Sequence, residues 1–242
     1  NTPMRELDSS LIGYILGYVL MALALSMLIP LFIEAQSAYA ANARIFFLCA
    51  AGTLFIGGML ALSNKAPLHI LSIRETVISI ILVLISAISV VSLPFYFIYP
   101  QIGIDGALFE ATALMTTTHA TTLSPEILSP GIIFWRSLLQ WIAGFGVIVL
   151  GTVYLPLLRI GGMDIFRLQS SNISAKAMPR TNSLLQKLAG LYAVLTALCA
   201  VCYMLAGMTI AEAVNYAMTT MISGGASFHK FGPASFNSSA IQ

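Results

Sequence analysis

The stretch that decides the fold covers residues 105–156 and begins D-G-A-L-F-E-A-T-A-L-M-T-T-T-H-A-T-T-L-S-P-E at Asp105, followed by a long apolar segment from Gly131. Residues 107–115 have a helical pattern that is too short to cross a bilayer, which takes about 20 residues. A polar run at 116–122 follows. Non-helical backbone at membrane depth is tolerated only where it is buried in protein or lines a water-filled cavity. A short helix, a polar turn and a spanning helix therefore predict a re-entrant pore loop, whose carbonyls can replace the hydration shell of a cation.

The composition places the chain in a membrane. Hydrophobic residues make up 58% of the sequence and charged residues only 8%, whereas a soluble domain is about 25% charged. The net charge of +2 gives no reason to expect a nucleic-acid partner. The three cysteines lie in apolar segments and predict packing rather than a metal or redox site. The sequence carries no Ser–His–acid set and no phosphate-binding loop, so we expect no enzyme activity.

Apolar segments along the chain predict an all-α integral membrane protein with two extra N-terminal spanning helices ahead of helix–pore-loop–helix repeats. The spans are expected at residues 11–32, 45–62, 76–99, 131–158 and 188–206, and a second short helix at 209–220 precedes another polar, glycine-bearing turn. Repeats of this kind are typical of transporter folds. Trp135, Trp141 and Tyr99 are predicted to lie at the membrane interfaces.

These elements predict four regions. Residues 1–75 hold the two N-terminal spans and a cytoplasmic loop, 76–158 the first repeat, 159–187 a basic cytoplasmic linker, and 188–242 a second repeat that stops after its filter. We therefore expect the N-terminal half of a longer protein. No signal peptide is expected, because no basic segment precedes a small-residue cleavage site.

The basic residues favour an N-terminus in the cytoplasm. With that orientation eight fall inside and three outside: Arg5, Lys65, Arg74, Arg159, Arg167, Lys176, Arg180 and Lys187 against Arg44, Arg136 and Lys230. This is the positive-inside bias of multi-pass membrane proteins. Both pore loops would then enter the membrane from the outer side.

Several motifs resemble one transporter family along almost the whole chain. They read F-E-A-T-x-x-x-T-T-T-x-A-T from Phe109, I-x-F-W-R-x-x-L-Q-W-x-x-G-x-G-V-I-V-L from Ile132, L-P-L-L-R-I-G-G-M-D-I-F-R from Leu155 and S-G-G-A-S from Ser223. The sequence resembles the TrkH branch of the Trk/Ktr/HKT potassium transporters. The resemblance implies four repeats around a pore, potassium as the bound ion, a bacterial inner membrane with its lipid, a homodimer of full-length subunits, and a cytoplasmic nucleotide-binding regulatory subunit of the TrkA type.

The resemblance also assigns filter residues. Potassium would be held by carbonyls of Thr117, Thr118 and His119 in the first loop, and of Ile222 and Ser223, with Gly224, in the second. The neighbouring Thr116, Ala120 and Gly225 would support these turns. From the residues alone, the first loop is equally a threonine-rich turn whose hydroxyl groups satisfy local backbone groups.

Charged residues near the loops are candidate supports. Glu110 and Glu212 lie in the two short helices, and carboxylates inside membranes are costly and usually functional or paired. We interpret both as charges that attract cations or brace the filters, with a helix cap at the membrane surface as the alternative. Arg136, at the outer end of the fourth span, could brace the first filter from behind.

His119 stands where the family carries a filter glycine. Histidine adopts a positive φ far less readily than glycine does, and its imidazole titrates near neutral pH. Three functions remain open: potassium uptake, a relaxed filter that also passes sodium, and a non-conducting scaffold or regulatory subunit whose first filter has decayed.

Overall fold

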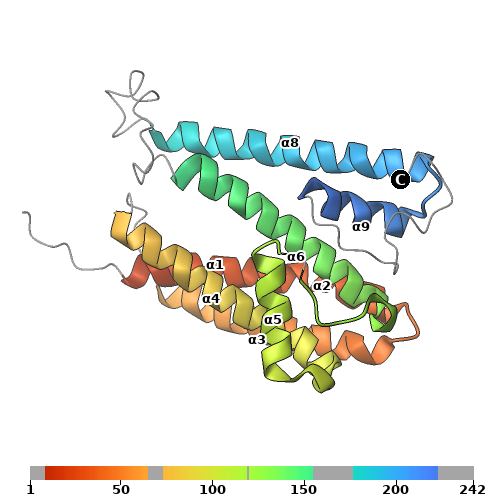
Figure 1. Ribbon diagram of the computed structural model, residues 1–242. Coiled ribbons are helices and arrows are strands. Elements are labelled where there is room, and N and C mark those ends of the chain that lie inside the picture. Colours follow the sequence, from red (N-terminus) through yellow and green to blue (C-terminus); the bar gives the residue numbers. More distant parts are fainter. Residues whose placement is uncertain (1–8, 65–72, 119, 155–176, 223–242) are drawn as a thin grey trace, which may run out of the picture. The chain divides into compact units, whose positions relative to one another are not determined.

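The computed structural model describes residues 9–64, 73–118, 120–154 and 177–222, and every regular element within them is helical. Five stretches are long and apolar enough to cross a membrane: Ser9–Ala35, Ala40–Ser63, Glu75–Ile98, Pro130–Thr152 and Ser183–Leu205. The five predicted spans are thereby confirmed, and the chain is an all-α integral membrane protein (Figure 1). It divides into two compact units, Asn1–Arg136 and Ser137–Gln242.

The first span consists of two helices, α1 (Ser9–Ser26) and α2 (Leu28–Ala35). The interruption follows from Pro30, which has no N–H to donate to the carbonyl of Ser26 one turn earlier. The backbone N–H of Met27 still donates to the carbonyl oxygen of Leu23 at 3.2 Å. The chain therefore continues past the proline and ends the span at Ala35, beyond the expected end at residue 32.

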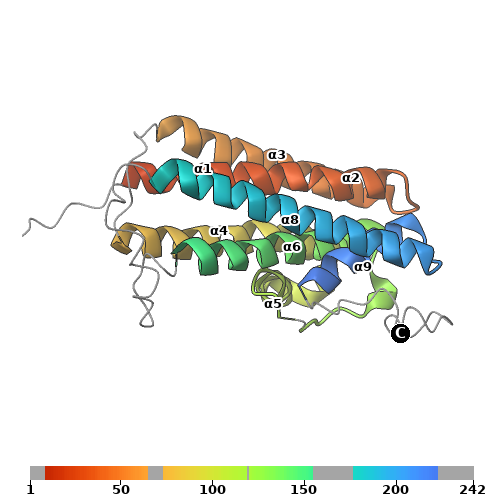
Figure 2. The ribbon, with the colours of Figure 1, turned by 90° about the horizontal axis from the view of Figure 1, so that it is seen from above.

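Helix α1 packs against α3 (Ala40–Ser63) and α4 (Ile73–Ile98) in the first unit (Figures 1 and 2). Glycines make the closest approach possible. A Cβ at Gly17 would lie 2.7 Å from the carbonyl oxygen of Gly57, and a Cβ at Gly57 would lie 2.9 Å from the carbonyl oxygen of Gly17. Small residues at such crossings let membrane helices gain contact without a hydrophobic driving force.

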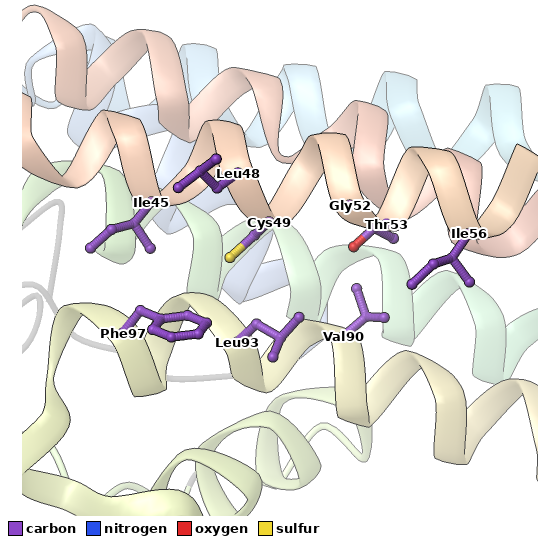
Figure 3. Close-up of a pocket in the computed structure, with 9 residues that line it drawn as sticks. All are labelled: Ile45, Leu48, Cys49, Gly52, Thr53, Ile56, Val90, Leu93 and Phe97. Atoms are coloured by element: carbon purple, nitrogen blue, oxygen red, sulfur yellow. The ribbon is translucent and has the colours of Figure 1, made fainter.

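A cavity of about 300 Å³ lies between α3 and α4 (Figure 3). Its lining is apolar apart from the thiol of Cys49 and the hydroxyl of Thr53, and it includes the side chains of Ile45, Val90 and Phe97. A dehydrated cation needs several oxygen ligands. This cavity is therefore no candidate ion site.

The short helix of the first unit is α5 (Gly103–Met115), which follows the short 3-10 turn η1 (Pro100–Ile102) and packs against α4. Its 13 residues extend about 20 Å, which cannot cross a hydrocarbon core of about 30 Å. The chain then returns through the turn η2 (Pro125–Ile127) to the spanning helix α6 (Pro130–Val149).

The first turns of α6 are buried against the N-terminal helices. Trp135 is fully buried and packs edge-on against Phe46 of α3, with ring centroids 6.2 Å apart. Tyr99, after α4, is also buried. The prediction of an interfacial belt is therefore wrong for Trp135 and Tyr99, because both side chains fill the core of the first unit.

In the second unit, α6 continues into the π-helical turn η3 (Leu150–Tyr154), and α8 (Ala177–Leu205) packs against α9 (Ile210–Met221). The indole N–H of Trp141 donates to Thr196 Oγ1 at 3.0 Å, which ties α6 to α8. Helix α8 begins at Ala177, earlier than the expected start of the fifth span at residue 188. Residues 177–187, part of the predicted basic linker, are therefore helical, and residues 159–176 lie outside the described residues.

Candidate functional site

The short helix α5 ends in a tight hydrogen-bonded turn at the predicted filter. The N–H of Thr118 donates to the carbonyl oxygen of Ala113 at 2.8 Å, and the N–H of Thr117 donates to that of Leu114 at 3.2 Å. These two bonds define a Schellman C-terminus, in which the residue after the cap takes a left-handed conformation and is usually glycine. Here that residue is Thr117, with φ of 56°.

Thr117 is an unusual residue for this conformation. A β-branched side chain at positive φ is a genuine outlier, and the left-handed region costs an L-residue about 1–2 kcal/mol. From the sequence we expected the demand for positive φ at residue 119. His119 itself lies outside the described residues, together with Ser223, Gly224 and Gly225.

The hydroxyl groups of this segment satisfy local backbone groups. Thr112 Oγ1 donates to the carbonyl oxygen of Leu108 at 2.7 Å, and Thr116 Oγ1 donates to that of Thr112 at 2.8 Å. Within the described residues, the carbonyl oxygens of Thr117 and Thr118 accept no hydrogen bond. They lie at the C-terminal end of α5, where the helix dipole places partial negative charge that stabilises a cation.

Glu110 organises the chain that follows the predicted filter. Its side chain is fully buried. Its Oε1 accepts hydrogen bonds from the N–H of Thr122 at 2.5 Å, the hydroxyls of Thr121 and Thr122 at 2.7 and 3.0 Å, and the N–H of Leu123 at 3.3 Å. Charge-assisted bonds of this kind are stronger than neutral ones. Glu110 thus fixes residues 121–123, directly beyond Ala120.

Arg136 faces the other oxygen of the same carboxylate. Its Nη2 lies 3.7 Å from Glu110 Oε2, and the exposed fractions of the two side chains are 11% and 0%. Breaking a buried pair by removing one partner leaves an uncompensated charge and costs about 3–5 kcal/mol. The structure therefore brings together Glu110, Arg136 and residues 121–123, the segment after the predicted first filter.

In the second unit Glu212 has a different place from Glu110. It completes a capping box at the start of α9, where Glu212 Oε2 accepts from the N–H of Thr209 at 3.0 Å and Thr209 Oγ1 accepts from the N–H of Glu212 at 3.4 Å. The alternative interpretation, a helix cap, therefore describes Glu212 better than filter bracing. The motif T-x-x-E at residues 209–212 carried this signal in the sequence.

Asn215, rather than Glu212, occupies the position in α9 that matches Glu110. Asn215 lies nine residues before Gly224, and Glu110 lies nine residues before His119, the two positions at which the family motif has glycine. Asn215 is buried, its Nδ2 donates to the carbonyl oxygen of Ala211 at 2.9 Å, and its Oδ1 has no partner among the described residues. The two short helices, α5 and α9, thus carry a buried polar side chain at the corresponding position.

Ile222 caps the C-terminus of α9 and packs on α6. A Cβ added at Gly144 would collide with Cγ2 of Ile222 and would lie 3.3 Å from the hydroxyl oxygen of Tyr192. Gly144 is therefore the residue of α6 that leaves room for a predicted filter residue.

A second buried carboxylate, not predicted from the sequence, lies at the start of α6. Glu34 of α2 is fully buried, and its Oε1 accepts hydrogen bonds from the hydroxyl of Ser129 and from the N–H of Gly131, the latter at 3.1 Å. The phenol of Tyr99 accepts from the N–H of Ser129 at 2.9 Å and donates to the carbonyl oxygen of Ile127 at 3.2 Å. Burial raises the pKa of Tyr99, so its hydroxyl stays protonated and keeps donating.

The known proteins that match this sequence are transporters. The profile of the TrkH family, described as a cation transport protein, matches residues 43–242. The Trk system potassium uptake protein TrkI of Halomonas elongata is 41% identical over 57% of this chain and 28% of its own length. TrkH of Escherichia coli is 33% identical over 94% of this chain and 48% of its own length.

A solved structure agrees with these matches. The crystal structure of the potassium transporter TrkH from Vibrio parahaemolyticus superposes with a TM-score of 0.82 at 32% identity, covering 98% of this chain and 47% of that one. The chain thus spans about half the length of the Escherichia coli relative. Its match with the Halomonas relative covers less than a third of that protein. The family profile matches most of the residues, and the fold agrees with that of a solved TrkH. The chain therefore belongs to the TrkH family of cation transport proteins.

Proposed function

We propose that this chain is part of a potassium uptake transporter, in which re-entrant pore loops form a selectivity filter. The relatives' names support potassium as the ion. The observation that carries the proposal is the end of α5, where the carbonyls of Thr117 and Thr118 have no partner in the described part of the chain and Glu110 braces the segment beyond them. Ile222, Ser223 and Gly224 form the second filter in this proposal.

The wider assembly belongs to the same proposal. Residues 76–158 and 188–242 are two repeats of a pore that the full-length gene product completes. The subunit forms a homodimer in the bacterial inner membrane, keeps its N-terminus in the cytoplasm, and binds a regulatory subunit of the TrkA type. The positive-inside count supports the orientation, and the Trk system names of the relatives support a further subunit. The homodimer and the type of the regulatory subunit rest on the family resemblance alone.

Glycine substitution in the second filter tests the proposal. Gly224→Ser in the full-length protein adds a Cβ where the family motif has glycine, and we expect the ratio of potassium to sodium uptake to fall about tenfold, which corresponds to ~1.4 kcal/mol. The measurement is tracer uptake in bacteria that lack their own potassium transporters. Gly146→Ser is the matched control, because a Cβ at Gly146 meets no atom within 4 Å. An unchanged ratio in Gly224→Ser at normal membrane levels would contradict the filter assignment.

His119 favours a second candidate, a filter that also passes sodium. His119→Gly restores the family residue at this position. If the native filter is relaxed, the glycine variant raises the ratio of potassium to sodium uptake in the same assay. If it is selective as it stands, the ratio does not change.

A further inference from the structure

Glu34 is a buried carboxylate on a helix that lies outside the predicted pore repeats. It belongs to the last turn of α2, in the first span, whereas its partners Ser129 and Gly131 begin α6. Ser129 caps that helix, since its carbonyl oxygen accepts the first helical bond from the N–H of Ile133 at 3.0 Å. A carboxylate at this end of a helix is stabilised by unpaired N–H groups and by the dipole.

The contact is tightly fitted on both sides. A Cβ added at Gly131 would lie 2.7 Å from Glu34 Oε1, so the carboxylate occupies the space that any other residue at 131 would need. The second oxygen of Glu34 accepts from the hydroxyl of Ser37 at 3.1 Å. Together with Tyr99, which holds the N–H of Ser129, Glu34 fixes where α6 begins.

The first two turns of α6 also hold Arg136, which faces the carboxylate beside the first filter. Arg136 follows Ser129 by seven residues and faces Glu110, which binds residues 121–123. The backbone between Ala120 and Ser129 is therefore held at one end by Glu110 and at the other by Glu34. A shift of the start of α6 would move Arg136 relative to Glu110 and loosen the chain beside Ala120.

We propose that Glu34 is a positioning residue for the first filter, acting through Ser129 and Gly131 on the placement of Arg136 and Glu110. The N-terminal helices would then set ion preference and not only anchor the protein in the membrane. This inference rests on the proposed function, because it assumes that residues 117–119 form part of the ion path.

Three variants of the full-length protein test the inference. Glu34→Ala removes both acceptor oxygens, and Ser129→Ala removes one donor. We expect Glu34→Ala to lower the ratio of potassium to sodium uptake about threefold or more, a size typical of residues that act through a network, and Ser129→Ala to lower it less. Glu34→Gln keeps an oxygen for Ser129 and Gly131 and places its amide beside Ser37, so it should retain the native ratio.

Controls separate positioning from folding. Leu20→Ala removes a buried side chain of α1, which is 4% exposed, and should lower the amount of folded protein without changing the ratio. A native ratio in both Glu34→Ala and Ser129→Ala, with only the protein level reduced, would overturn the inference. Equal loss of selectivity in Glu34→Gln and Glu34→Ala would also overturn it, because the hydrogen bonds would not be the cause. If Gly224→Ser alters selectivity while the Glu34 variants do not, the filter stands and only this inference fails.

Discussion

At the scale of single residues, Thr117 holds the least ordinary backbone of the candidate filter. Its φ of 56° is the single positive value outside glycine among the described residues. The two hydrogen bonds of the Schellman turn over-determine this conformation, which is how strained residues persist in folded proteins. The strain lies where the proposed ion path begins.

Substitutions at Thr117 test that strain. Thr117→Gly should raise the unfolding free energy of the purified full-length protein by about 1 kcal/mol, because glycine adopts positive φ without steric cost. Thr117→Pro should prevent accumulation in the membrane, since proline fixes φ near −65° and removes the N–H that bonds Leu114. The measurements are thermal unfolding in detergent and the amount of protein in membranes. Thr112→Ala, in the preceding turn of α5, is the control for loss of a threonine hydroxyl. A glycine variant clearly less stable than the native protein would show that the left-handed turn carries no strain.

Sequence reasoning identified Glu110 but not Glu34, for a physical reason. A carboxylate beside a polar run is visible in a one-dimensional pattern, whereas the partners of Glu34 lie 95 and 97 residues further along the chain. Glu34 is an ionisable residue at the end of an apolar span, a general signal of function that could have marked it. The place of Glu212 could be predicted from the T-x-x-E motif at residues 209–212, whereas the burial of Glu110 depends on tertiary packing.

At the scale of elements, the spans and both short helices followed from apolar segments and their lengths. Their limits did not. Helix α8 extends further towards its N-terminus than its apolar segment. Pro179 lies in the first turn, where proline is tolerated, and Gln186 and Lys187 lead into the apolar part with good helix propensity. The interruption between α1 and α2 depends on Pro30. Proline has no N–H to donate to the carbonyl four residues earlier, so the helix breaks in the turn that precedes it.

The packing of α9 on α6 makes a prediction at this scale. Gly144→Ala adds a methyl group that collides with Ile222, so the side chain of Ile222 or the C-terminus of α9 must move. We expect the variant to reach the membrane but to lose potassium over sodium preference, in the range of about three- to tenfold. Gly190→Ala in α8 is the control, because a Cβ there meets no atom within 4 Å. Native selectivity in Gly144→Ala would mean that the placement of Ile222 against α6 does not matter for the ion path.

At the scale of the whole molecule, charge and contacts make one joint prediction about sidedness. The positive-inside count predicts an N-terminus in the cytoplasm, so the connection between α2 and α3 is predicted to face outward. In the first unit, Glu34 binds Ser129, which brings that connection to the same end as the segment that precedes α6. The end of α3 at Ser63 lies one span away and is predicted to face the cytoplasm.

Cysteine labelling in intact cells tests this arrangement. Cys49, Cys199 and Cys202 are free and are first replaced by alanine. Single cysteines are then placed at exposed positions: Ala38→Cys, Ser124→Cys and Ser63→Cys. A membrane-impermeant maleimide added outside should label residues 38 and 124 but not 63, and permeabilised cells should label all three. Labelling of 63 alone would reverse the orientation. Labelling of only one of 38 and 124 would contradict a shared outer end, and with it the contact through which Glu34 reaches the pore loop.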